Sequence, residues 1–358
     1  MKKKISSKKI TSLLKKMPKT ELHLHLEGMV RKETIFLLCK KNPQNTVIRT
    51  MKDVYALFSF GSNLSDFIHA FIVLQDNIIC AEDFEYLMKD LKRYVTEHNI
   101  IYAEVFLAIS TPLRKGLLYR DIISVLERSV KKFEKNGSPR IRFIVDVSRS
   151  FGPENAMHNL NEVLKRPSKY VVGIGLGGDE SHGAAADYKA VFSKAAKHGL
   201  HLVSHAGEDA GKAKGAGEAS IRASLALLKS ERIGHGVAAM KDVQLMKELA
   251  QKKVPIEICV SSNVFTRRYI SKASGHPAKI FYKHGMLLTI NSDDPTFFDT
   301  DITREYQLFY KELGFSIDEL IALRDNGITA SFHPNKEKLL KDSRIQTEKL
   351  LKKMRLTG

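Results

Sequence analysis

Residues 20–28, TELHLHLEG, place two histidines two positions apart in a run that alternates with leucine. Successive side chains of a β-strand point to opposite faces, so His23 and His25 share one face and can bind one ion together. Two histidines do not complete the four-coordinate shell of a catalytic zinc. The stretch therefore predicts a strand that carries half of a metal site, with the remaining ligands elsewhere in the chain.

Seven further apolar runs follow this stretch, and longer amphipathic segments such as 82–98 and 241–252 separate them. The eight predicted strands are 22–26, 100–107, 142–147, 171–176, 200–204, 232–233, 256–260 and 287–290, of which 232–233 is the shortest. Eight alternations of strand and helix predict an α/β fold, a (β/α)₈ TIM barrel. The segment 29–99 is too long for one connecting helix, so we expect several extra helices there, placed to cover the barrel mouth.

The rest of the chain shows no domain boundary. We predict a single domain, residues 1–358, with a basic N-terminal extension (1–16) and a lysine-rich C-terminal helix or tail (336–358). No apolar run reaches the roughly 18 residues that a membrane span needs. Lysines interrupt the apolar residues at the N-terminus, so no secretory signal forms and a cytoplasmic protein is expected.

Cysteine content and charge narrow the functional classes further. Cys39, Cys80 and Cys259 are few and widely separated, which predicts reduced thiols rather than a disulfide framework. The formal net charge is +18, but no basic run is interleaved with the aromatic residues on which nucleic-acid bases stack. We therefore expect a solvated basic surface, and nucleic acid is not an expected partner.

Polar residues follow nearly every predicted strand, where barrel enzymes carry their active sites. They are His23, His25, Glu104, Asp146, Arg149, Gly178, His205, Glu208, His235, Asn263, Asp293 and Asp294. His23, His25 and His205, with a carboxylate from Asp293 or Asp294, form a plausible shell for one zinc ion. A zinc ion lowers the pKa of a bound water toward about 7 and so provides a hydroxide nucleophile. His182, His276 and His284 are given no role beyond packing or surface.

The other charged residues in this set suggest proton transfer. Glu208 follows His205 by three residues and can carry protons to a substrate, although acids also favour the first turn of a helix. His235, between two glycines in RIGHG, can orient or deprotonate the water. Asp293 and Asp294 repel each other unless a cation or a proton separates them, or they form an ordinary turn before Pro295.

Five motifs in this order resemble those of the adenosine deaminase family of amidohydrolase barrels. They are MPKTELHLHLEG (17–28), SHAGE (204–208), RIGHG (232–236), SSN (261–263) and NSDDP (291–295), and the resemblance extends from about Met17 to Phe332. It implies that His23, His25, His205 and Asp293 bind one zinc ion per chain, and that Glu208 protonates purine N1. Water activated by the zinc and oriented by His235 and Asp293 would then add to C6, and ammonia would leave. Gly178 would face purine N3, and Asp294 would bind N7.

The resemblance implies zinc-dependent hydrolytic deamination of a small 6-aminopurine nucleoside, with adenosine or deoxyadenosine as the first expectation. Glu27 stands where adenosine deaminases usually carry aspartate, next to the ribose 5′ end, so the 5′ group can differ. Residues 145–152, VDVSRSFG, and the segment GIGLGGDE resemble aminodeoxyfutalosine deaminases, whose substrate carries a benzoate on the 5′ side. Arg149 would pair with that carboxylate through a bidentate contact.

Other readings remain open at this point. Adenine deamination and a barrel that binds nucleosides or RNA without turnover are alternatives to nucleoside deamination. The absence of any Cys-x-x-Cys argues against the cytidine-deaminase type of zinc enzyme. The fourth predicted strand ends without a lysine, which favours one metal over the bridged pair of other amidohydrolases. The sequence gives no indication of the oligomeric state.

Overall fold

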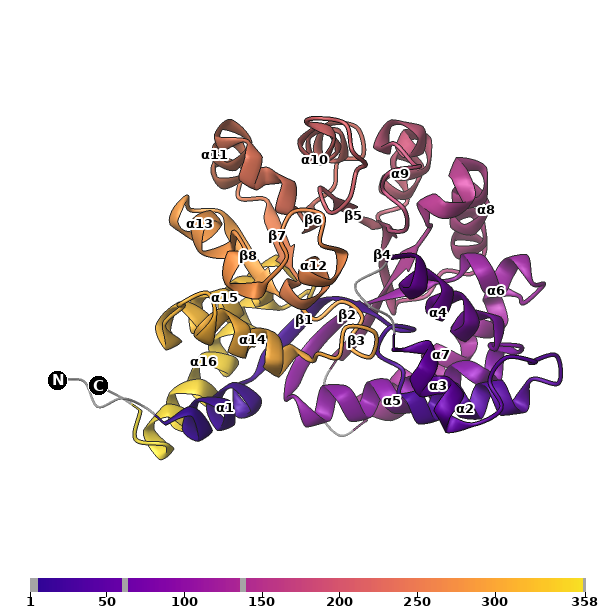
Figure 1. The fold of residues 1–358 in the computed structure, drawn as a ribbon, viewed down its shortest axis with the longest axis horizontal. Helices are drawn as coiled ribbons and strands as arrows, with labels where there is room; N and C mark the ends of the chain where they lie inside the picture. The colour runs from indigo at the N-terminus through magenta and orange to yellow at the C-terminus, as the bar shows by residue number, and fades with distance from the viewer. Residues whose placement is uncertain (1–5, 60–63, 136–139, 357–358) are drawn as a thin grey trace.

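The computed structural model describes residues 6–59, 64–135 and 140–356, and eight parallel strands form its centre (Figure 1). The strands pair in chain order: β1 (Lys19–His25), β2 (Ile100–Ala108), β3 (Arg140–Asp146), β4 (Val171–Leu176), β5 (His201–Ala206), β6 (Arg232–His235), β7 (Pro255–Ile258) and β8 (Leu287–Ile290). The residues after β8 return to β1, because His25 N–H donates to Asp293 O and Asp293 N–H donates to His23 O, each at 3.0 Å. The sheet is a nearly closed barrel, as the alternating pattern predicted.

Helices surround the strands. They are α1 (Ser7–Lys16), α2 (Lys32–Lys41), α3 (Met51–Leu57), α4 (Leu64–Asp76), α5 (Phe84–Glu97), α6 (Ser110–Arg114), α7 (Tyr119–Glu134), α8 (Gly152–Lys165), α9 (Lys189–Lys197), α10 (Ala216–Ala226), α11 (Val243–Gln251), α12 (Val260–Thr266), α13 (Ala278–Lys283), α14 (Ile302–Lys311), α15 (Ile317–Ala330) and α16 (Lys336–Lys353). Four of them, α2 to α5, fill the predicted insertion between the first two strands. The same segment contributes Phe67 and Phe71 of α4 to the wall of the central cavity.

The predicted strand positions are confirmed, with differences at their ends. β4 and β8 have the predicted bounds, whereas β6 has four residues because Gly234 and His235 continue the pairing with β5. Neither residue is apolar and β-branched, which is why the sequence signal stops at Ile233. Glu104 does not lie at a strand tip: it is a fully buried residue within β2 that forms an ion pair with Arg232 of β6 at 2.7 Å.

The N-terminal segment is a packed helix from Ser7 onward. α1 buries Ile10 and Leu14 and contacts α14 and α16. The buried Lys19 side chain donates hydrogen bonds to the carbonyls of Leu14 and Met17, both at 2.7 Å, and so satisfies groups at the end of this helix. The first helix, α1, and the last, α16, lie on the same side of the barrel (Figure 1). Residues 1–5 and 357–358 of the predicted extension and tail lie outside the described residues.

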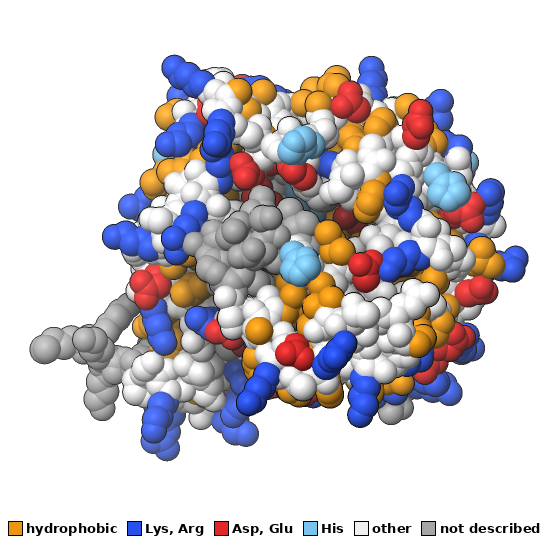
Figure 2. Space-filling view, turned by 45° about the vertical axis from the view of Figure 1, so that its right-hand side comes forward, with side chains coloured by type: hydrophobic (Ala, Val, Ile, Leu, Met, Phe, Trp, Pro, Cys, Tyr) orange, Lys and Arg blue, Asp and Glu red, His pale blue; other side chains and the backbone are white. Residues whose placement is uncertain are grey.

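Charged side chains are distributed over the molecular surface. Figure 2 shows lysines and arginines scattered across one face rather than gathered in a single patch. Two of the three cysteines, Cys39 and Cys259, are buried, Cys80 is partly exposed, and all three are free thiols. None of the helices formed by the described residues combines the length and the apolar character needed to cross a lipid bilayer.

Candidate active site

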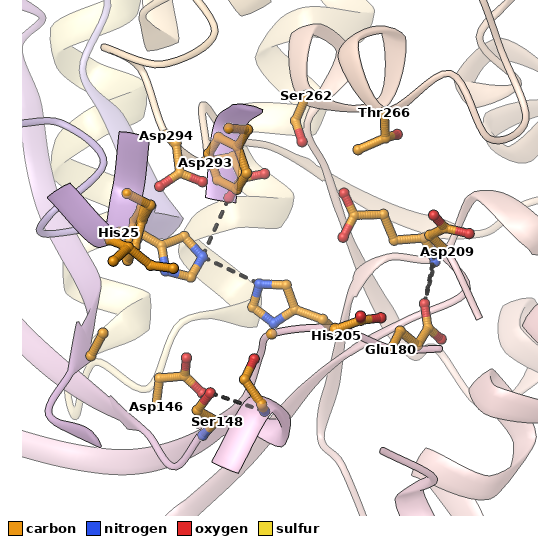
Figure 3. A pocket seen from close by; sticks show the side chains of 18 of the residues that line it. His25, Asp146, Ser148, Glu180, His205, Asp209, Ser262, Thr266, Asp293 and Asp294 are labelled. Atoms are coloured by element: carbon orange, nitrogen blue, oxygen red, sulfur yellow. Dashed lines mark hydrogen bonds and ion pairs between the residues drawn. The ribbon is translucent and has the colours of Figure 1, made fainter. Parts of the chain in front are cut away.

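A cavity of about 350 Å³ opens at the carboxyl ends of the strands (Figure 3). Its polar lining comes from the strand ends and includes His25, His205, Glu208, His235, Asp293 and Asp294. Its apolar lining consists of Phe67, Phe71, Ile72, Phe151, Phe265 and Phe298. Carboxyl ends of barrel strands are where enzymes of this fold hold their reacting groups, so this cavity is the candidate active site.

The predicted metal ligands converge at the wall of the cavity. His25 Nε2 lies 3.2 Å from His205 Nε2 and 3.3 Å from Asp293 Oδ1, and these side chains face one another in Figure 3. His23 Nε2 is buried without a hydrogen-bond partner among the described residues, and Asp293 Oδ1 lies 3.5 Å away. Three imidazole nitrogens around one carboxylate are a donor set that suits a divalent transition metal. The residues present therefore fit a single metal ion.

A buried row of charges supports His23 from inside the barrel. Its Nδ1 lies 2.7 Å from Glu257 Oε2, and Glu257 Oε1 accepts a hydrogen bond from Arg232 Nε at 2.5 Å. Burial alone would raise the pKa of Glu257, but the positive charge of Arg232 holds it below its usual value. An ionised Glu257 accepts a hydrogen bond from the Nδ1–H of His23. The proton stays on Nδ1, which leaves the Nε2 lone pair of His23 free for an ion. In the sequence, these interactions are marked by Arg232 and Glu257, two charged residues inside otherwise apolar strands.

A Glu257→Gln variant is expected to bind metal about 10- to 100-fold more weakly than the wild type, because the amide no longer fixes the orientation and tautomer of His23. Zinc affinity is measured by competition with a chromophoric chelator. Glu319→Gln, in the partly buried first turn of α15 where Glu319 pairs with Lys279, serves as the matched control and is expected to bind zinc as the wild type does. Equal affinities in both variants would remove Glu257 from this role.

A chain of hydrogen bonds fixes the proton of His235. The Ala278 N–H donates to His276 Nδ1 at 3.1 Å, so the proton of neutral His276 is on Nε2 and faces Asn263 Oδ1 at 3.2 Å. The Asn263 amide then points its Nδ2 at His235 Nδ1, 3.0 Å away. Burial lowers the pKa of His235 to about 3, so this ring is neutral and carries its only proton on Nε2.

That nitrogen faces the reacting groups. His235 Nε2 lies 3.4 Å from Glu208 Oε2 and 3.8 Å from Asp293 Oδ2. Of the two roles the sequence left open, this tautomer favours orientation of a water by hydrogen-bond donation over removal of its proton. His276 was not recognised from the sequence, because its position beside Asn263 depends on the packing of two separate segments.

Glu208 is placed by a second carboxylate. The backbone N–H groups of Gly207, Glu208 and Asp209 all donate to the carboxylate of Glu180, at 2.6, 2.9 and 2.9 Å. Burial, with the charge of Asp293, raises the pKa of Glu208 well above its usual value. The raised pKa favours the protonated form of Glu208, which suits a proton donor, and Glu208 lies in the loop before α10 rather than in the first turn of that helix.

The predicted purine-binding residues lie beside this group. Asp294 lines the cavity, and burial together with Asp293 raises its pKa well above the usual value, which favours the protonated form that can donate a hydrogen bond. It occupies the space where a side chain at Gly28 would be, since a Cβ there would lie 1.8 Å from Asp294 Oδ1. Gly178 also lines the cavity, with a φ of +89° that favours glycine.

The other two predicted substrate contacts are not among the cavity-lining residues. Glu27 is fully buried, accepts a hydrogen bond from the Ala108 N–H at 3.2 Å, and has a pKa raised by burial to about 7. Arg149 is also buried, and its guanidinium donates to the carbonyls of Gly183 and, at 2.5 Å, His205. The structure thus holds Arg149 against the backbone behind the metal site.

An Arg149→Gln variant is expected to lose roughly 2 to 3 kcal/mol of unfolding free energy, because the buried carbonyls lose charged donors. Its kcat/KM should fall by one common factor for substrates with and without a carboxylate. Thermal unfolding and steady-state kinetics on both kinds of substrate provide the two readouts. A selective loss for the carboxylated substrate at unchanged stability would place Arg149 against the substrate instead.

Comparison with known proteins finds a matching family model and curated relatives that are named as deaminases. A family model described as adenosine deaminase matches residues 18–348. Curated relatives include an adenine deaminase from Psychrobacter cryohalolentis, 30% identical over 89% of this chain and 94% of its own length. They also include aminodeoxyfutalosine deaminases from Streptomyces avermitilis (30% identical; 90% of this chain, 88% of that protein) and Streptomyces coelicolor (31%; 88% and 80%).

Solved structures share the whole fold. An amidohydrolase from Burkholderia ambifaria with bound zinc superposes with a TM-score of 0.89 at 19% identity, covering 100% of this chain and 97% of the other. An adenine deaminase from Arthrobacter aurescens gives 0.81 at 24% identity, covering 95% and 99%. An N6-methyl-AMP deaminase from Arabidopsis thaliana gives 0.80 at 23%, covering 95% and 98%. With a family model that spans nearly the entire chain, five motifs in order and a matching site, this protein belongs to the adenosine deaminase family of the amidohydrolase superfamily.

Proposed function

We propose that this protein uses one zinc ion to hydrolyse the exocyclic amino group of a 6-aminopurine nucleoside whose 5′ side carries an aromatic group, as in aminodeoxyfutalosine. The products are the 6-oxopurine nucleoside and ammonia. The observation that carries the proposal is a single cavity with two linings, one of histidines and carboxyl groups and one of aromatic rings. The two Streptomyces relatives named for this activity support the same assignment.

The polar lining provides the groups for attack at C6. Protonated Glu208 donates to purine N1, which draws electrons from C6, and protonated Asp294 donates to N7. The Nε2–H of His235 faces the Asp293 carboxylate and orients a water by hydrogen bonding. A zinc ion held by His23, His25, His205 and Asp293 would lower the pKa of that water.

The apolar lining explains why a substituted nucleoside is favoured over adenosine, the first expectation from the sequence. Phe67, Phe71, Phe265 and Phe298 form a connected cluster, with ring centroids 5.1 to 6.2 Å apart between neighbours. Adenosine carries only a polar hydroxymethyl group at its 5′ side and would leave these rings in contact with water. An aromatic 5′ group would bury against them, and each aromatic pair adds about 0.5 to 1.5 kcal/mol beyond burial.

Adenine is the second candidate substrate. The Psychrobacter relative named adenine deaminase matches this chain as well as the Streptomyces proteins do, at 30% identity. Free adenine would use only the polar lining, so its affinity would not depend on the aromatic cluster. Whether the affinity for substrate depends on the aromatic cluster therefore distinguishes the two candidate substrates.

The test is ammonia release by the zinc-loaded protein from adenine, adenosine, deoxyadenosine and aminodeoxyfutalosine. We expect the highest kcat/KM for aminodeoxyfutalosine, and a selective loss of that value in Phe71→Ala. A preference for adenine that Phe71→Ala leaves unchanged would replace the first candidate by the second. Binding of nucleosides without ammonia release from any of the four would support the non-enzymatic alternative.

A further inference from the structure

The cavity wall is rich in carboxyl groups and has no cation of its own. Among the described residues that line it, seven are Asp or Glu and none is Lys or Arg. Three guanidinium groups contact lining residues from behind or beside them: Arg114, Arg149 and Arg268. Arg149 is bound to two carbonyls, and Arg268 is paired with Asp209 at 3.2 Å. Of these three guanidinium groups, Arg114 alone has no carboxylate or carbonyl partner among the described residues, so it can serve as a counter-charge for an anionic group on a substrate.

Arg114 lies beside the lining of the cavity. Its guanidinium carbon is 4.9 Å from the ring centroid of Phe151, which lines the cavity and is 38% exposed. In the described part of the chain, no carboxylate or carbonyl binds the Arg114 side chain, which is exposed. Stacking on an aromatic ring restrains the planar guanidinium while leaving its N–H edges available for a bidentate acceptor.

The neighbouring side chains extend this position into the cavity. Ser110 and Thr111 precede Arg114 by four and three residues on α6, so all three share one face of the helix, and the first two line the cavity. Thr111 donates a hydrogen bond to Gln75 Oε1 at 2.8 Å, which leaves the Gln75 amide N–H groups to donate to a ligand. Gln75 also lines the cavity.

We propose that Arg114, stacked on Phe151 and assisted by Gln75 and Ser110, forms a subsite that binds a carboxylate at the outer end of the substrate. The inference rests on the proposed function in one respect, because the carboxylate must be carried beyond the ribose on an aromatic spacer that contacts the apolar lining. A phosphate attached directly to the ribose would lie among the carboxyl groups of the wall instead.

Adenosine 5′-thioethers test the subsite. The 5′-S-phenyl and 5′-S-(3-carboxyphenyl) derivatives of 5′-thioadenosine differ only in the carboxylate, and AMP carries the alternative anion. Both kcat/KM and the Kd of the zinc-loaded protein, from calorimetry on the 6-oxo product analogues, are measured for the wild type, Arg114→Gln and Arg114→Lys. Arg120→Gln, which removes an exposed arginine on α7 whose Nε lies 3.8 Å from Oδ1 of its neighbour Asp121, is the control.

In Arg114→Gln we expect the carboxylated compound to lose roughly 10- to 100-fold in kcat/KM, through KM, and a similar factor in affinity. The phenyl compound and AMP should change less than twofold, and Arg114→Lys should restore part of the loss. Equal losses for the phenyl and carboxyphenyl compounds, or no loss for either, would overturn the subsite. A matching loss for AMP would show a general anion site rather than a carboxylate site.

The two proposals fail in different ways. If the wild type releases no ammonia from any of these nucleosides, the proposed function fails. The Kd ratio of the carboxyphenyl to the phenyl product analogue still decides the subsite, because it requires binding but no turnover. A ratio that Arg114→Gln leaves unchanged overturns the subsite even in a fully active enzyme.

Discussion

A Glu208→Gln variant should bind metal and substrate as the wild type does and lose roughly two to four orders of magnitude in kcat, the usual contribution of general acid catalysis. The amide keeps the size of the side chain and the backbone contacts of its loop with Glu180, but it has no acidic proton to give to purine N1. Single-turnover kinetics at saturating substrate measure the loss. Glu218→Gln, in the first turn of α10, removes a nearby carboxylate outside the cavity lining and should remain within twofold of the wild type.

The pH dependence follows from the same group. Because burial and the charge of Asp293 raise the pKa of Glu208, the carboxyl group keeps its proton to a higher pH than an ordinary glutamate and loses it as the pH rises through the raised value. The rate should therefore fall on the alkaline side, and the Gln variant should lack that fall. Near wild-type turnover in the variant, or an alkaline limb that persists in it, would remove Glu208 from the role of acid.

Replacing a predicted metal ligand should abolish activity altogether. In His205→Ala the proposed shell loses the imidazole whose Nε2 lies 3.2 Å from that of His25, and the remaining residues would have to hold the ion with one nitrogen fewer. We expect the purified variant to contain far less than one equivalent of zinc and to release no measurable ammonia. Chelation should likewise inactivate the wild type, and added zinc should restore it.

The control for this prediction is another histidine in the same part of the chain. His198→Ala changes an exposed ring whose Nδ1 lies 2.9 Å from the Lys194 carbonyl at the end of α9, and it should retain both metal and activity. Metal content is measured by elemental analysis on the active protein. Less than about half an equivalent of zinc in fully active wild type, or full activity in His205→Ala, would contradict a metal-dependent reaction.

Much of the barrel and of the polar site could be predicted from the sequence because both depend on short-range periodicity. The two-residue spacing of His23 and His25 places them on one face of a strand, and the barrel rule places His205, His235 and Asp293 at the same end. These inferences need only the order of the strands. The parallel pairing of β1 through β8 supplies the rest.

The residues that could not be predicted are those whose surroundings come from several distant segments. Glu104 resembled a strand-tip acid but pairs with Arg232 inside the barrel, and nothing in the local sequence marks the depth at which a strand residue sits. Arg149 is at a strand end, yet its guanidinium turns to the carbonyls of Gly183 and His205, which lie in later segments. The direction of a long side chain depends on such neighbours and not on its own sequence position.

The seam between β1 and the residues after β8 also bears on how the protein matures. The peptide groups that join the two edges belong to His23, His25 and Asp293, so the first and last parts of the barrel must meet before the ligand set exists. During synthesis, which adds about 5 to 20 residues per second, the N-terminal histidines leave the ribosome well before Asp293 does. The nascent chain therefore holds only part of the predicted ligand set until nearly all of it has been made, so we expect a metal ion bound by this set to be captured late, after the barrel has closed.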